Sequence, residues 1–192
     1  MSETLLTKQI KVGLYYHTKA HLQGVYGAFE VACGTTLGYG SEFVDFMTMD
    51  STNVFRCYEI KISKSDLKSP AKWSFYGDYN YFVVPVELAE ETLAFLRNMG
   101  ETRYGIIVVR EVKGKLDFCI KKKPVKQRIG IDQRIANMHN MVRSGSRYTT
   151  KFVDETRREL WKDEYWAGLL KETEEVSDEE WVEMFGHHKD YA

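Results

Sequence analysis

Two acidic residues and a lysine stand out because their types and spacing suit phosphodiester chemistry. Asp45 lies in the apolar run 43–46, and Glu59 and Lys61 lie in the run 57–61. In an extended strand, residues two apart share one face, so Glu59 and Lys61 point the same way and a neighbouring strand can bring Asp45 to them. Carboxylates that are flanked by apolar residues cost free energy unless they are paired or bind a metal ion.

This pattern predicts a site for Mg²⁺ or Mn²⁺. Asp45 and Glu59 would hold the ion, with the main-chain carbonyl of Ile60 as a further oxygen ligand. The ion would polarise a phosphate group and lower the pKa of a bound water. Lys61 would position that water or stabilise the developing negative charge. The bare spacing is common, so an ordinary Glu59–Lys61 pair on a solvated strand face is the alternative that these residues leave open.

The apolar pattern along the chain predicts a mixed sheet with helices beside it. The expected elements run from an N-terminal helix through three strands to a helical connection, two buried strands separated by a helix, and a final strand. These lie at residues 3–22, 26–33, 43–49, 54–62, 63–76, 81–85, 87–98, 105–109 and 115–121. The remainder is expected to be helical, with separate helices over residues 131–143 and 152–170.

The acidic residue on the second strand, followed by Glu-x-Lys on the third, resembles the PD-(D/E)XK nuclease superfamily. More narrowly, the stretch Tyr58–Leu67 is similar to the MmcB-like branch, which is associated with DNA repair. The segment Phe29–Val31 also resembles the corresponding part of small proteins encoded by phages of Gram-positive bacteria. The resemblance covers residues 1–128 as a fold pattern and is sharpest over residues 30–84.

The resemblance implies a restriction-endonuclease-like α/β fold, in which a mixed β-sheet with an αβββαβ core is flanked by helices. The nuclease-like domain would span residues 1–128, and a helical C-terminal extension would span residues 129–192. The implied activity is Mg²⁺- or Mn²⁺-dependent cleavage of DNA. Asp45 and Glu59 would bind the metal, and Lys61 would be the catalytic lysine.

A third acidic ligand is also implied, because many members of the superfamily add a glutamate from the first helix. In this chain Glu3 alone could serve from that helix, and Glu30 on the preceding strand is the other candidate. We expect Glu30 to join Asp45, Glu59 and the carbonyl of Ile60 at the metal.

Charge is distributed unevenly along the chain, although the net charge is -1. Residues 110–147 hold 11 basic and 3 acidic residues, whereas residues 171–192 hold 2 basic and 8 acidic residues. A basic segment predicts a surface for a polyanion, and mutual neutralisation of the two segments is the alternative. In a non-catalytic module with this fold, the acidic tail would be a surface for a protein partner or a DNA mimic. The basic cluster expected to contact DNA phosphates comprises Lys121, Lys122, Lys123 and Lys126.

The composition and the apolar pattern also bear on where the protein is located. No apolar run approaches the roughly 20 residues that a membrane-spanning helix needs, and the N-terminus lacks the pattern of a secretory signal. Three widely spaced cysteines, none in a Cys-x-x-Cys pair, are typical of a reduced protein, so we expect a cytoplasmic location.

A homodimer would suit cleavage of both strands of a duplex. The alternative function is a non-catalytic module with this fold that binds nucleic acid or a host protein.

Overall fold

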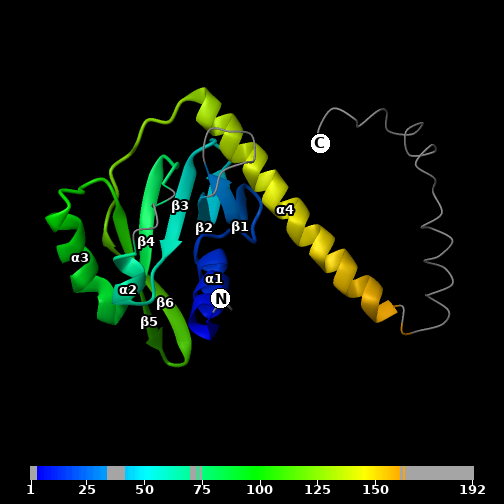
Figure 1. The fold of residues 1–192 in the computed structure, drawn as a ribbon, viewed down its shortest axis with the longest axis horizontal. Coiled ribbons are helices and arrows are strands. Elements are labelled where there is room, and N and C mark those ends of the chain that lie inside the picture. The colour runs from blue at the N-terminus through cyan, green and yellow to red at the C-terminus, as the bar shows by residue number, and fades with distance from the viewer. Residues whose placement is uncertain (1–3, 34–41, 70–72, 74, 161, 163–192) are drawn as a thin grey trace. The chain divides into compact units, whose positions relative to one another are not determined.

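The computed structural model of the chain describes residues 4–33, 42–69, 73, 75–160 and 162. These residues form a mixed α/β fold around a six-stranded sheet (Figure 1). In chain order, the first elements are α1 (Leu5–His17), β1 (Val25–Cys33), β2 (Glu42–Asp50), β3 (Phe55–Ile60) and α2 (Lys64–Leu67). The later ones are β4 (Tyr79–Pro85), the 3₁₀ turn η1 (Val86–Leu88), α3 (Ala89–Asn98), β5 (Gly105–Val112), β6 (Lys115–Lys122) and α4 (Ile131–Leu160).

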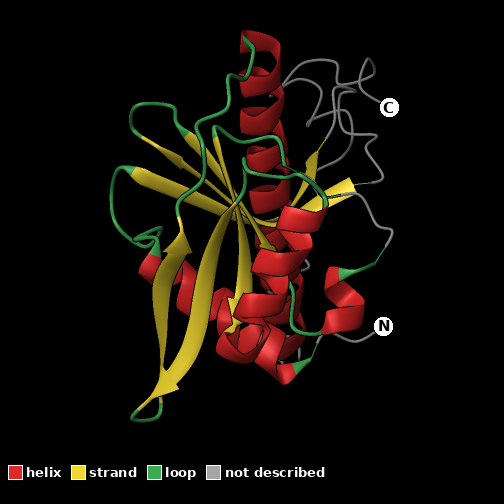
Figure 2. Ribbon diagram, turned by 90° about the vertical axis from the view of Figure 1, so that its left-hand side faces the viewer, coloured by secondary structure: helices red, strands yellow, loops and turns green. Residues whose placement is uncertain are grey.

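The six strands lie in the sheet in chain order, from β1 at one edge to β6 at the other. β1, β2 and β3 pair antiparallel, β4 and β5 run parallel to β3, and β6 returns antiparallel to β5. Parallel neighbours need a crossover, which α2 supplies between β3 and β4 and α3 supplies between β4 and β5. The expected mixed sheet flanked by helices is therefore confirmed, and Figure 2 shows its twist.

One face of the sheet is covered by α1. Ile10 and Leu14 are fully buried against a layer that includes Phe46, Tyr58 and Ile60. Gly13 favours the close approach of α1 to β6, because a Cβ atom there would lie 2.7 Å from the ring of Phe118, which would have to move.

The opposite face is covered by α2 and α3 and by the start of α4. Phe82, on β4, belongs to a layer with Leu67 of α2 and Leu96 of α3. Met141 of α4 packs in a neighbouring layer with Val44 of β2. This division leaves the C-terminal ends of β1 and β3, together with the N-terminal end of β2, between α1 on one face and α2 and α4 on the other.

The helix α4 is longer than the sequence indicated. It runs without interruption through residues 144–151, where a break between two helices was expected. The chain divides into two compact units, Met1–Ser146 and Arg147–Ala192, so the first unit extends past residue 128. None of the described helices is both long and apolar enough to cross a membrane. The expected acidic tail, residues 171–192, lies outside the described residues.

Polar contacts attach the start of α4 to the sheet. The amide of Asn137 donates to the carbonyl of Tyr76 at 2.9 Å, and the Ser144 hydroxyl donates to the carbonyl of Phe29. The guanidinium of Arg134 makes a two-pronged contact with Asp78, with distances of 2.6 and 3.1 Å. Asp78 is 1% exposed and also accepts the main-chain N–H of Phe55 at 2.9 Å, so it joins α4 to β3.

We predict that Asp78→Ala lowers the free energy of unfolding by about 3–5 kcal/mol, because it leaves the Arg134 guanidinium without its buried partner. Asp117→Ala removes the corresponding partner of Arg110 in an exposed pair and should cost no more than about 1 kcal/mol. Urea unfolding of the two variants gives the comparison. Equal losses would show that Asp78 does not anchor α4.

Candidate active site

The candidate site forms where β2 and β3 stop pairing. The ladder between them runs from Met49↔Phe55 to Phe46↔Tyr58 and goes no further. Beyond it, the Asp45 carboxylate accepts the main-chain N–H of Ile60 at 2.7 Å. A side chain therefore takes the place of the backbone acceptor that a continued ladder would supply.

Lys61 lies just past the end of β3, between two carboxylates. Its Nζ is 3.8 Å from Oε2 of Glu59 and 3.4 Å from Oδ1 of Asp66. The side chain of Lys61 is 13% exposed and Glu59 is 5% exposed. Glu59 is thus buried and Lys61 largely shielded from solvent, so the pair does not lie on a solvated strand face.

Asp45 belongs electrostatically to the same group. Burial raises the pKa of the Asp45 carboxyl above its ordinary value, while the hydrogen bond from Ile60 and the positive charges of Lys61 and Lys11 act in the opposite direction. Asp66 lies close enough to add to the rise. Lys61 thus acts on the Asp45 carboxylate and contacts the Glu59 carboxylate, so it links the two acidic residues that the sequence analysis singled out.

A hydrogen-bonded turn holds the far side of Lys61. The Ser63 hydroxyl accepts the N–H of Asp66 at 3.1 Å, and the Asp66 carboxylate accepts the N–H of Ile62 at 3.2 Å. Ser63 is the N-cap of α2. Asp66 has a second role that the sequence did not indicate, because the same carboxylate also contacts Lys61.

The oxygen atoms at the site suit a hard divalent cation. The N–H and C=O of one strand residue point to the same side, so the carbonyl of Ile60 faces β2 together with its N–H, which bonds Asp45. Asp45, Glu59 and this carbonyl offer the all-oxygen ligation that Mg²⁺ and Mn²⁺ prefer. Among the described residues, no three Asp, Glu, His or Cys side chains lie close enough to hold a metal.

Glu30 on β1 lies opposite Asp45 on β2, but its side chain contacts a lysine. The pairs Phe29↔Phe46 and Val31↔Val44 place Glu30 opposite Asp45 in register. Its backbone has a φ of 51°, and its Oε1 accepts from Nζ of Lys11 at 3.0 Å. The structure therefore brings the expected third acidic residue to the site's border, where it pairs with a lysine. Glu3, the alternative, lies outside the described residues.

Sequence reasoning missed Lys11. It lies on α1, its side chain is 12% exposed, and its charge acts on Asp45 as well as on Glu30. The resemblance implied a carboxylate from α1, whereas the helix contributes a cation. A lysine between the buried positions Ile10 and Leu14 was the available signal.

The expected DNA-contacting cluster, Lys121, Lys122, Lys123 and Lys126, is not at this site. β6 runs antiparallel to β5, so Lys122 pairs with Ile106 near the start of β5. Two of the lysines have contacts that the sequence did not indicate. Lys121 pairs with Glu90 at 3.0 Å, and Lys122 donates to the carbonyls of Thr102 and Tyr104.

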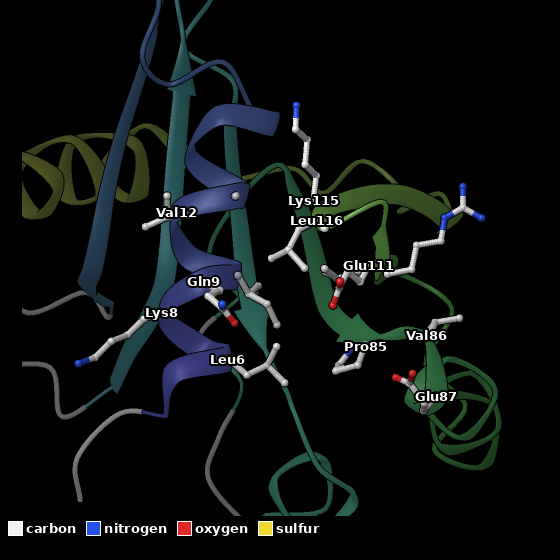
Figure 3. A pocket seen from close by; sticks show the side chains of 15 residues that line it. Leu6, Lys8, Gln9, Val12, Pro85, Val86, Glu87, Glu111, Lys115 and Leu116 are labelled. Atoms are coloured by element: carbon white, nitrogen blue, oxygen red, sulfur yellow. The ribbon is translucent and has the colours of Figure 1, made fainter.

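An open groove of about 830 Å³ lies on the other side of α1 (Figure 3). It separates the helix from the ends of β4 and β5 and the start of β6, and its lining mixes apolar and charged side chains. Asp45, Glu59 and Lys61 are not among the residues that line it. The groove has charged side chains of its own, but its carboxylates, Glu87 and Glu111, are exposed. Glu59 is buried, so we take the group around it as the candidate site.

Comparison with known proteins supports the fold alone. No protein-family model matches the chain, and no curated protein matches it. The SPO1766 protein of unknown function from Silicibacter pomeroyi has a similar solved structure, with a TM-score of 0.59. The two sequences are 18% identical, and the match covers 81% of this chain and 96% of that one.

We predict that the wild-type protein binds Mn²⁺ and that Asp45→Asn weakens binding by about tenfold or more, since loss of a ligand should cost at least as much as loss of a supporting group. Isothermal titration calorimetry measures this, with the exposed Asp117→Asn as a control that keeps wild-type affinity. Glu30→Gln, measured in parallel, asks whether Glu30 is a ligand. Binding by Asp45→Asn at wild-type affinity would refute the proposed metal site.

Proposed function

We propose that this protein is a Mg²⁺- or Mn²⁺-dependent nuclease that cleaves DNA and belongs to the PD-(D/E)XK superfamily. The observation that carries the proposal is the position of Lys61, held by Glu59 and Asp66 beside Asp45. An aspartate near the start of β2 and a Glu-x-Lys sequence at the end of β3 occur in the element order that the resemblance implies. We also propose that the protein acts in a phage or in DNA repair, as the resemblance implies.

Each residue has a role that its geometry suits. Asp45 and Glu59, with the carbonyl of Ile60, would hold the metal ion. When bound, the metal would supply a Lewis acid for the phosphate and a more acidic water. Lys61 would place its ammonium group against the reacting phosphate or the attacking water, where a fixed positive charge stabilises developing negative charge. Asp66 would fix the direction of the Lys61 side chain.

One observation favours a second candidate, a DNA-binding module that does not cleave. Within the described part of the chain, Asp45 and Glu59 are not joined by a third acidic side chain at metal-binding distance. Glu30, the expected third acidic residue, is paired with Lys11. A protein with this arrangement could bind a nucleic-acid backbone through the lysines and lack the metal affinity that hydrolysis needs.

We predict metal-dependent cleavage by the wild type and a loss of about 100- to 1,000-fold in Lys61→Ala, the range found when a group that stabilises transition-state charge is removed. The assay uses linear, circular, single-stranded and branched DNA with Mn²⁺ or Mg²⁺. Lys64→Ala is the control, because Lys64 lies three residues away but its side chain is 73% exposed and pairs with Glu91.

The loss of a buried cation can also unfold the site, so circular dichroism accompanies the assay, and Lys61→Met keeps the apolar stem of the side chain. Folded Lys61 variants that cut as fast as the wild type would refute the catalytic role. No cutting of any substrate by the wild type, together with retained DNA binding, would favour the non-catalytic module.

The basic cluster gives a separate prediction. Lys123→Gln with Lys126→Gln should weaken DNA binding and make its salt dependence shallower, by about 0.9 in the log–log slope for each phosphate that the variant no longer binds, while kcat stays unchanged. Lys122 is kept because it supports main-chain carbonyls. The control removes two exposed lysines elsewhere, Lys19 and Lys113. An equal slope in the two double variants would exclude the cluster from the DNA footprint.

A further inference from the structure

Helix α1 contributes a nearly buried lysine to the candidate site. Lysine side chains are rarely buried without a specific partner, yet Lys11 is only 12% exposed. Its Nζ lies 3.0 Å from Oε1 of Glu30, whose side chain is 55% exposed. The pair thus joins a shielded cation to a carboxylate that water can reach.

The packing of α1 fixes where Lys11 lies over the sheet. Tyr15 follows one helical turn later on the same side of α1. Its ring centroid is 6.2 Å from that of Phe29 and 6.4 Å from that of Phe46. These two phenylalanines are paired across β1 and β2, next to Glu30 and Asp45 in sequence. Lys11, one turn earlier, therefore lies over the Glu30–Asp45 position.

The backbone is irregular at that position. Glu30 adopts a left-handed conformation, with a φ of 51°, which costs a residue other than glycine on the order of 1 kcal/mol. Val31 and Val44 pack in the layer with Met141, whereas Phe29 and Phe46 pack in the layer under α1. Residues two apart on each strand thus face opposite layers, so both strands lose their regular alternation at Glu30 and Asp45.

We propose that Lys11 is a substrate-binding residue whose ammonium group exchanges Glu30 for a phosphate oxygen of DNA. The inference rests on the proposed nuclease function and adds the group that places the DNA backbone against Asp45. Lys61 follows β3 and is held by two carboxylates, whereas Lys11 comes from α1 and contacts an exposed one. An ammonium–phosphate contact is a charge-assisted hydrogen bond, which can replace the contact with a hydrated carboxylate.

The experiment compares Lys11→Gln with Lys8→Gln, which removes the same charge from an exposed position on the same helix. Binding of a fluorescent DNA duplex is measured by anisotropy over a range of salt concentrations without metal. We expect Lys11→Gln to weaken binding several-fold and to make the log–log slope shallower by about 0.9, the value for one phosphate contact. Lys8→Gln should stay within about twofold of the wild type, because this inference gives it no phosphate contact.

Kinetics with Mn²⁺ separate binding from assembly of the metal site. Lys11→Gln should raise KM and lower kcat/KM while Mn²⁺ affinity is kept, and Lys11→Arg should restore part of the loss. The double variant Lys11→Gln with Glu30→Gln removes both charges of the pair, and it should show the same loss of DNA affinity if the single variant folds poorly.

The outcomes distinguish this inference from the function on which it rests. Equal affinity and slope for Lys11→Gln and Lys8→Gln, with a wild type that cleaves, would overturn the role of Lys11 alone. Loss of Mn²⁺ binding in Lys11→Gln with unchanged DNA affinity would also overturn it. A wild type that binds DNA through Lys11 but never cleaves would support the contact and overturn hydrolysis. A wild type that binds no DNA would overturn both.

Discussion

The hydrogen bond from the Ile60 main chain to the Asp45 carboxylate determines where the sheet opens. Had β2 and β3 continued their register past Phe46↔Tyr58, Asp45 would stand directly opposite Glu59. Two like charges at facing positions of an antiparallel pair destabilise it. Because Asp45 instead bonds the N–H of Ile60, the ladder ends there without leaving that donor unsatisfied. The same bond puts the Ile60 carbonyl beside the carboxylate, so the end of the ladder creates the oxygen-rich side of the site.

Once two carboxylates are brought together at partial burial, cations must accompany them. Lys61 contacts Glu59 and Asp66 on one side, and Lys11 contacts Glu30 on the other. With every group ionised, the four carboxylates and two lysines carry a net charge of about −2, which one divalent cation neutralises. Either lysine could turn to a phosphate only if something else compensated the carboxylate it leaves. A metal ion held by Asp45 and Glu59 would do so for Lys61, and water around the exposed Glu30 would do so for Lys11.

Much of this arrangement could be predicted from sequence, because it depends on local periodicity. The apolar runs located the strands, and the two-residue period of a strand put Glu59 and Lys61 on one side of β3. Lys11 could not be found in this way, since its role depends on how α1 lies on the sheet. The continuous α4 was also missed, because a segment containing Gly145 between two serines is a weak helix former. Contacts made by Ser144 and Asn137 with main-chain carbonyls attach this part of the helix to the sheet, and local propensity does not report them.

The distance between the site and the basic cluster limits how DNA could reach both. The row of paired residues from Ile60 passes through Val83 and Ile107 to Ile120. It spans three strand spacings, or roughly 14 Å. Lys61 follows Ile60 at the C-terminal end of β3. Because β6 runs antiparallel to β5, residues 121–126 follow Ile120 toward the opposite end of the sheet. One phosphate cannot contact both groups. Under the proposed nuclease function, a bound strand or duplex would have to cross the sheet obliquely, and the cluster would hold phosphates remote from the bond to be cut.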